Sequence, residues 1–204
     1  AEKLDDLVKE MNDQELKDYY ENEMEEKAEV EFKSSLLVTA EGPYTGKKMK
    51  GKDYPKLTDA VVEAVAGMAN RKGYDEGVVV VGLMEKKISE TGKNEILGIE
   101  YDFQNTLQNR DDWELLLRNK LSGVLKDGFY QTQLSFEFPK VNNLTLCRIR
   151  CPTVKYLKEK LGVKEQGFVW LGEKGRQRLM LRDGPRTRRL DGEDIVKYQD
   201  SYWD

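Results

Sequence analysis

The run Gly-Val-Val-Val-Val-Gly-Leu at residues 77–83 constrains the fold of this chain more than any other stretch. Four consecutive valines between glycines are typical of a strand buried on both faces, because a half-exposed strand alternates apolar with polar residues. Such a strand needs a covering layer on each side of its sheet. We therefore expect helices to flank this strand.

Apolar positions with helical spacing predict those covering helices. Pro55 precedes the first turn of one of them and Gly73 ends it. The predicted helices fall at 3–28, within 52–73, and at 111–125, 153–162 and 191–199. Alternating or apolar stretches predict strands at 29–33, 94–103, 130–139, 144–152, 167–172 and 178–184. This order predicts an α+β domain with a mixed sheet flanked by helices and an added N-terminal helix.

The chain has 204 residues and no histidine. Without histidine it cannot build a Ser-His-Asp triad, a Cys-His pair or a histidine general base. Cys147 and Cys151 lie four residues apart on one strand, too far for an unstrained disulfide. There is no phosphate-binding loop of the Walker type and no apolar run long enough for a membrane span. We expect a cytoplasmic protein without membrane contact.

Charge is unevenly distributed along the chain. Residues 1–31 hold 13 acidic and 4 basic residues, while the whole chain carries a net charge of −4, so residues 32–204 carry an excess of positive charge. This asymmetry fits either an acidic solvated helix on an ordinary domain or a domain with an electropositive face. We expect residues 1–23 to form an acidic helix used in oligomerisation. Residues 24–204 then form the domain, with a lysine-rich insertion at 42–55.

Five motifs follow one another in a fixed order along the chain. They are Glu26 with Glu31-Phe32-Lys33, the helix end at 66–70, Gly73 and Gly77 before the valine run, Leu97-Gly98-Ile99 with Asp102, and the segment 168–190 with Arg182-Asp183-Gly184 and Thr187. This ordered set resembles the Schlafen AlbA-like domain family, over residues 24–200. The chain departs from the family pattern in three places: an insertion separates two glycines that the family has together, Glu85 stands where the family has aspartate, and the lysine-rich loop is extra.

The resemblance implies a three-carboxylate metal site formed by Glu26, Glu31 and Glu85, with Lys33 placed to bind the scissile phosphate. Carboxylates that share a pocket repel one another unless a divalent cation neutralises them, and oxygen ligands suit Mg²⁺ or Mn²⁺. Such a cation can activate water for phosphodiester cleavage in a protein that has no histidine. The alternative is that these glutamates are solvated surface charges, since Glu26 lies in an acidic run.

Basic segments indicate phosphate contact independently of the resemblance. Residues 174–190 contain seven basic residues and one acidic residue alternating with apolar ones, which predicts a hairpin with a row of arginines on one face. Charged edge strands that block aggregation are the alternative. The predicted nucleic-acid-binding residues are Arg176, Arg178, Arg182, Arg186, Arg188 and Arg189 in this segment, together with Lys47, Lys48 and Lys50 in the insertion.

The leading hypothesis is a nucleic-acid-binding Schlafen-like domain, with RNA favoured over DNA, that acts as a metal-dependent endoribonuclease on structured RNA such as tRNA. The resemblance implies a homodimer, because family nucleases grip their substrate with two lobes. A non-catalytic DNA-binding regulatory domain is the first alternative. A protein-interaction scaffold, in which the acidic helix binds a basic partner, is the second.

Overall fold

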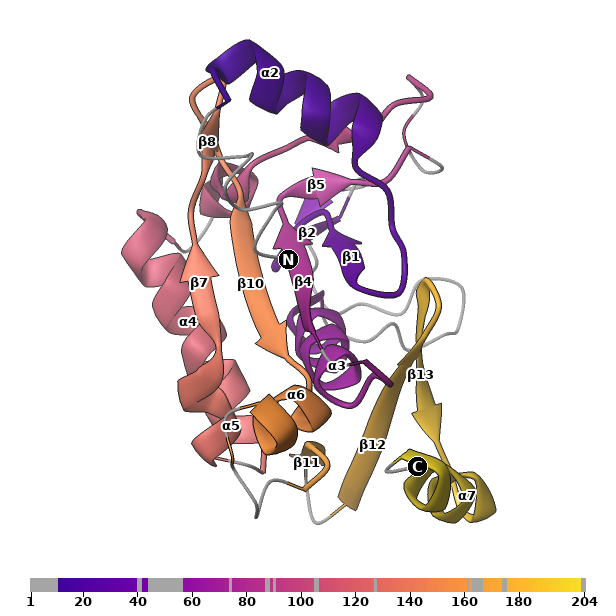
Figure 1. The fold of residues 1–204 in the computed structure, drawn as a ribbon. Coiled ribbons are helices and arrows are strands. Elements are labelled where there is room, and N and C mark those ends of the chain that lie inside the picture. Colours follow the sequence, from indigo (N-terminus) through magenta and orange to yellow (C-terminus); the bar gives the residue numbers. More distant parts are fainter. Residues whose placement is uncertain are drawn as a thin grey trace.

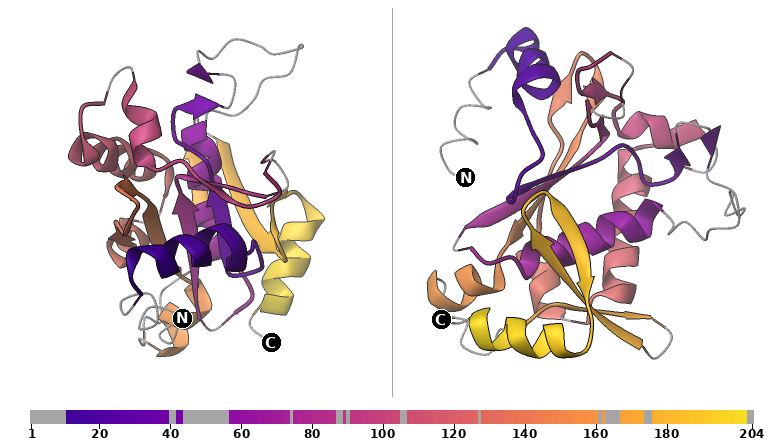
Figure 2. Two further views of the ribbon diagram at one scale, coloured as in Figure 1. Left: turned by 90° about the horizontal axis from the view of Figure 1, so that it is seen from above. Right: turned by 90° about the vertical axis from the view of Figure 1, so that its right-hand side faces the viewer.

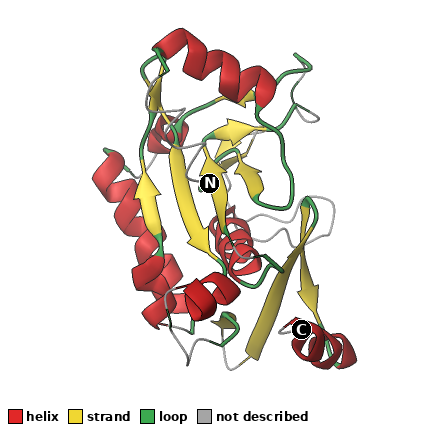
Figure 3. Ribbon diagram, viewed as in Figure 1, coloured by secondary structure: helices red, strands yellow, loops and turns green. Residues whose placement is uncertain are grey.

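The computed structural model describes residues 11–39, 42–43, 57–73, 75–86, 89, 91–104, 107–126, 128–160, 162, 167–173 and 176–202. These residues form an α+β fold (Figures 1 and 3). The helices are α2 (Asp13–Asp18), the π-helix η1 (Tyr19–Glu23), α3 (Leu57–Ala69), the 3₁₀-helix η2 (Ile99–Gln104), α4 (Arg110–Val124), α5 (Gly128–Gln133), α6 (Val154–Lys160) and α7 (Glu193–Tyr202). No helix in the described ranges is long and apolar enough to cross a membrane.

The main sheet has the strand order β1-β4-β10-β7, built from β1 (Val30–Lys33), β4 (Glu76–Val81), β7 (Ser135–Glu137) and β10 (Cys147–Pro152). Strand β1 runs parallel to β4, and β10 is antiparallel to both β4 and β7. A second sheet consists of β11 (Trp170–Glu173), β12 (Arg176–Asp183) and β13 (Arg186–Leu190). Three short ladders pair β2 (Val38–Thr39) with β3 (Gly42–Pro43), β5 (Leu83–Met84) with β6 (Glu95–Ile96), and β8 (Lys140–Val141) with β9 (Leu144–Thr145).

Strand β4 is buried on both faces, as the valine run predicts. Val79 and Val81 belong to the larger hydrophobic cluster, which also contains residues of α3 and α4. Val78 and Val80 belong to a second cluster on the opposite face, which contains Leu16 and Tyr20 from the N-terminal helices. The described part of the N-terminal helical segment is therefore a covering layer of the sheet.

That helical segment is shorter than the sequence pattern predicts. Asn12 caps it in a reciprocal capping box with Glu15. The helix ends at Glu23, because the following residues turn back so that the backbone groups of Lys27 and Val30 bond to each other. The predicted continuation to residue 28 is wrong.

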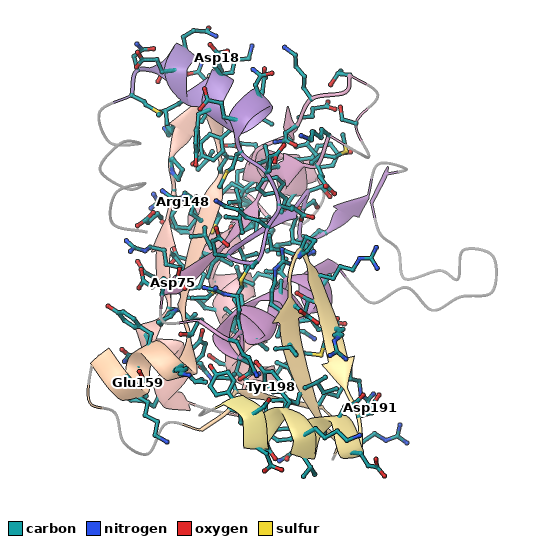
Figure 4. The ribbon with its side chains drawn as sticks, turned by 45° about the vertical axis from the view of Figure 1, so that its right-hand side comes forward. Asp18, Asp75, Arg148, Glu159, Asp191 and Tyr198 are labelled. Atoms are coloured by element: carbon teal, nitrogen blue, oxygen red, sulfur yellow. The ribbon has the colours of Figure 1, made fainter. Side chains whose placement is uncertain are left out.

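The second sheet lies across α3, as the right-hand view of Figure 2 shows. Asn70, at the end of the predicted helix motif, joins the two layers. Its amide nitrogen donates to the carbonyls of Val169 (2.8 Å) and Met180 (2.9 Å), and its amide oxygen accepts from the Val169 N–H (2.8 Å). Tyr198 on α7, labelled in Figure 4, donates its hydroxyl proton to the Asn70 carbonyl (2.6 Å). One buried side chain therefore joins the end of α3 to β12 and to the residue that precedes β11.

Three local predictions differ from the structure. Residues 130–133 belong to α5 and not to a strand, because Tyr130 turns into the core and donates to the Pro152 carbonyl (2.9 Å). Residues 99–104 form η2 in place of the predicted return strand. The helix predicted at 111–125 begins one residue earlier, at Arg110, and is capped by Asn109, whose side chain accepts from the Asp112 N–H (2.9 Å).

Asp102 forms a buried hydrogen-bonded centre between η2, α4 and the segment after β1. Its carboxylate accepts from the indole nitrogen of Trp113 (2.7 Å) and from the N–H groups of Leu36 and Leu37 (2.9 Å each). The hydroxyl of Ser35 also donates to it. The resemblance had singled out Asp102 as a motif residue, and in the structure its contacts are structural.

We predict that Asp102→Ala lowers the free energy of unfolding by about 3 kcal/mol or more, because several buried donors lose their acceptor at once. Asp111→Ala is the matched control: Asp111 is exposed in the first turn of α4, and its loss should cost at most about 1 kcal/mol. Urea unfolding followed by circular dichroism measures both. Equal effects for the two variants would contradict the structural role of Asp102.

Candidate functional site

The candidate site is arranged around the edge strand β1. Alternation along this strand directs Val30 and Phe32 into the hydrophobic cluster beneath the N-terminal helices. Glu31 and Lys33 have the opposite orientation and line a pocket together with α3 and the start of β13. Glu31 is buried, with 7% of its surface exposed.

A buried guanidinium from the second sheet neutralises Glu31. Arg182 on β12 forms an ion pair with the Glu31 carboxylate, and its side chain is 0% exposed. The same guanidinium donates to the carbonyls of Lys27 (2.8 Å) and Val30 (2.7 Å). Burial lowers the pKa of Arg182 to about 10, and the negative charges of Glu26 and Glu29 oppose that shift. Arg182 therefore holds the edge of the main sheet against the hairpin.

Arg182 does not lie where the arginine-row prediction places it. The Arg182 side chain is fully buried, and its guanidinium donates to two backbone carbonyls. It therefore cannot reach a phosphate in this arrangement. The reason is positional: residues 180 and 182 face the same side of β12, and that side is covered, since Met180 is part of the main core.

Glu26 and Glu85 line one small pocket of about 140 Å³ with Phe32 and Asn94. Glu26 accepts a hydrogen bond from the backbone N–H of Phe32 (2.8 Å), on the outer edge of β1. Glu31 opens instead into the pocket on the α3 side. The three predicted metal ligands are thus near neighbours, distributed over two pockets.

Lys33 lines the same pocket as Glu31. It is paired with Glu31, and 24% of its side chain is exposed. Burial lowers the pKa of Lys33, and this shift is opposed by the nearby negative charges of Glu26, Glu63 and Glu85. Of the four predicted catalytic residues, the structure thus pairs Lys33 with Glu31, while Glu26 and Glu85 line the other pocket.

The positions and cationic partners of the three glutamates restrict how they could bind a metal ion. Within the described part of the chain, no group of three or more Asp, Glu or Cys side chains is arranged to hold a cation. Glu31 already has two cationic partners, Arg182 and Lys33. A divalent cation that used all three glutamates would have to displace at least one of them. Metal binding by Glu26, Glu31 and Glu85 stays a prediction.

The arginines of the hairpin do not form one row. Strand register places Arg186 opposite Asp183 and Arg188 opposite Leu181, on the face toward α7. Arg189 is opposite Met180, on the other face. Arg178 lies on the covered side of β12, where it pairs with Glu63 of α3 (2.7 Å).

Four of the predicted arginines are exposed: Arg176, Arg186, Arg188 and Arg189. Arg189 pairs with Asp191 (2.7 Å), and Arg188 makes a long contact with Asp183 (3.8 Å). Figure 4 labels Asp191 beside the end of the hairpin. The predicted lysines Lys47, Lys48 and Lys50 lie outside the described residues.

Sequence reasoning missed Glu63. It lies on α3, between Ala60 and Ala64, and faces the same pocket as Lys33. Asp59 and Glu63, four residues apart, are the two carboxylates of an otherwise mostly apolar helix, and this spacing on one face is a usable signal. Its partner Arg178 is 115 residues away in sequence, so the pairing itself could not be read from the chain.

No family model matches the chain, and neither does any curated protein. Among solved structures, it is similar to the DIP2311 protein from Corynebacterium diphtheriae, with 20% identity and a TM-score of 0.47 over 86% of this chain and 24% of that one. It is also similar to the N-terminal domain of a protein from Nitrosomonas europaea related to the ATP-dependent DNA helicase RecG, with 16% identity and a TM-score of 0.46 over 84% of each chain. The chain thus spans about a quarter of the length of the DIP2311 protein.

We predict that Arg182→Met lowers the free energy of unfolding by about 3–5 kcal/mol, because it leaves the buried Glu31 without its main cation. The Glu31→Gln/Arg182→Met double variant should lose at least about 1 kcal/mol less than the sum of the single variants. Arg188→Met, at an exposed position, should change stability by less than about 0.5 kcal/mol. Additive single-variant effects in urea unfolding would contradict the coupling.

Proposed function

We propose that this chain is a nucleic-acid-binding α+β domain that contacts the phosphate backbone through the turn of the β12–β13 hairpin. One observation carries the proposal. Arg178 and Arg182 form ion pairs with carboxylates of other elements, whereas Arg186 and Arg188 are exposed just after the turn. The turn itself is tight, because Gly184 takes a positive φ of 57° and Pro185 follows it.

Guanidinium groups at such a turn suit phosphate recognition. Each offers a rigid fork of donors that matches two phosphate oxygens, and a two-residue hairpin keeps the arginines at a fixed spacing. The chain as a whole carries a net charge of −4, which favours a localised contact over diffuse attraction. RNA is the preferred partner in this proposal, and the support for that preference is the family resemblance alone.

Association of two copies through the acidic N-terminal segment is part of the same proposal. Leu16 and Tyr20 pack inward on the sheet, while Asp13, Glu15 and Asp18 are exposed. An acidic exposed face does not pair with a second copy of itself, so a dimer through this segment needs basic residues of the partner opposite it.

We predict that nucleic-acid affinity falls steeply with salt and that Arg186→Gln/Arg188→Gln reduces the log–log salt slope by about 1.5, because two phosphate contacts are lost. Arg110→Gln is the control, since Arg110 is an exposed cation on α4 that stacks over Phe138 (5.1 Å). Fluorescence anisotropy with labelled RNA at four salt concentrations gives the slopes. A slope unchanged in the double variant, or no binding at all, would contradict the proposal and favour a scaffold role.

A metal-dependent endoribonuclease is the second candidate. The observation that favours it is that Glu26 and Glu85 line one pocket and both favour the protonated form of Lys33, which pairs with Glu31. Bound Mg²⁺ or Mn²⁺ would supply the activated water, with Glu26 and Glu85 as the carboxylates not taken up by Arg182.

For this candidate we predict manganese-dependent cleavage of tRNA that EDTA abolishes and that Glu26→Gln and Glu85→Gln each reduce at least about tenfold. Glu23→Gln is the control, because Glu23 lines a different pocket. Gel electrophoresis of labelled tRNA measures the rate. Salt-sensitive binding without cleavage would leave the first proposal standing and remove the second.

A further inference from the structure

Asn94, which directly precedes β6, is a buried polar residue that connects two segments distant in the sequence. Only 3% of its surface is exposed. Its amide nitrogen donates to the carbonyls of Tyr20 (2.9 Å) and Met24 (2.8 Å), and its backbone N–H donates to the Glu21 carbonyl (3.0 Å). Its amide oxygen accepts from the Lys86 N–H (2.9 Å). Asn94 therefore joins the end of the N-terminal helical segment to the turn that follows β5.

The π-helical form of η1 makes its end available to Asn94. In a π-helix each N–H bonds one residue further back than in an α-helix. The Met24 N–H accordingly donates to the Tyr19 carbonyl (2.8 Å). The Tyr20 carbonyl, which an α-helix would pair with Met24, accepts from Asn94. The last carbonyls of a helix need donors from outside it, and Asn94 supplies them here.

The Asn94 amide oxygen fixes the backbone beside Glu85. The Glu85 carbonyl accepts from the Ser89 N–H (3.1 Å), and the N–H of the same peptide unit, which belongs to Lys86, donates to Asn94. Both polar groups of this peptide unit are therefore bonded. This restricts the direction from which the Glu85 side chain approaches the pocket of about 140 Å³ that it lines.

The Asn94 amide nitrogen fixes the backbone beside Glu26. The carbonyl of Met24, which accepts from it, lies two residues before Glu26 in the chain. Asn94 itself lines the pocket with Glu26 and Glu85. One amide group thus bonds to the chain next to each of the two carboxylates and determines how far apart they lie.

An ion pair between Lys86 and Glu25 also spans the two segments. Its side chains are 41% and 63% exposed. Exposed ion pairs contribute little to stability, because water and salt screen them and both side chains lose freedom. A buried amide with all its contacts inside the protein is the stronger constraint. Asn94 is therefore the main connection between the segments of Glu26 and Glu85.

We propose that Asn94 is the positioning residue of the candidate metal site, where it holds Glu26 and Glu85 at the separation that binds Mg²⁺ or Mn²⁺. This inference rests on the second candidate function, the metal-dependent endoribonuclease. Without Asn94, cation binding would also have to order two segments of backbone, and this ordering would weaken the affinity. Residues that orient metal ligands affect metal affinity in the same way.

The test compares Asn94→Ala with Asn119→Ala, an exposed asparagine on α4. Electron paramagnetic resonance of free Mn²⁺ gives the affinity of the protein without nucleic acid. We predict that Asn94→Ala raises the Kd for Mn²⁺ at least about tenfold and that Asn119→Ala leaves it unchanged. Thermal melting shows which variants are folded at the working temperature. Asn94→Ser, which retains one donor, replaces Asn94→Ala if the latter does not fold, and the same direction is expected.

Cleavage of labelled tRNA over a range of Mn²⁺ concentrations separates positioning from general destabilisation. Positioning predicts that Asn94→Ala raises the Mn²⁺ concentration for half-maximal rate about tenfold, while saturating Mn²⁺ restores the wild-type rate. General destabilisation would lower the saturating rate without moving the half-maximal concentration, and that result would overturn the inference.

The outcomes also separate this inference from the second candidate function. Mn²⁺ binding that Glu26→Gln and Glu85→Gln abolish and Asn94→Ala weakens, without any cleavage of tRNA, supports the positioning role and removes the endoribonuclease. Mn²⁺ binding and cleavage that Asn94→Ala leaves unchanged overturn the positioning role and retain the endoribonuclease. A wild-type protein that does not bind Mn²⁺ overturns both.

Discussion

The ion pair between Glu31 and Arg182 is the constraint on which the arrangement of this molecule depends, because it joins the edge strand of the main sheet to the middle strand of the second sheet. An edge strand leaves a row of backbone groups without partners. Here the Val30 carbonyl accepts from Arg182, and the Phe32 N–H donates to Glu26. Side chains therefore close the edge, and pairing of a further strand at β1 would have to displace them.

The same pair determines which residues remain for function. The pair buries Glu31, a predicted metal ligand, together with Arg182, a predicted phosphate contact. A buried ion pair contributes little net stability compared with apolar packing, and its value lies in fixing one arrangement. In this chain that arrangement places the hairpin turn beside α3, where Pro185 and Thr187 line the pocket that contains Lys33.

Sequence reasoning predicted the buried strand β4, helix α3 and the general α+β class, because these follow from local periodicity. It also included Asn70 and Asp102 among the motif residues, but it did not predict the buried hydrogen bonds that they form. Both act through contacts 11 to 110 residues away in the chain, which no local pattern encodes. The arginine row failed for a related reason. Alternation in 176–182 assigns residues to faces, but which face is covered depends on α3, a distant element.

Strand β1 separates two pockets with different linings. The pocket on the α3 side contains Lys33 together with Glu31 and Glu63, whereas the pocket on the outer edge contains Glu26 and Glu85. The two sides differ because alternation along one short strand turns Glu31 and Lys33 away from Phe32. Glu31 therefore lines a different pocket from Glu26 and Glu85, although Glu26 and Glu31 are only five residues apart in the chain.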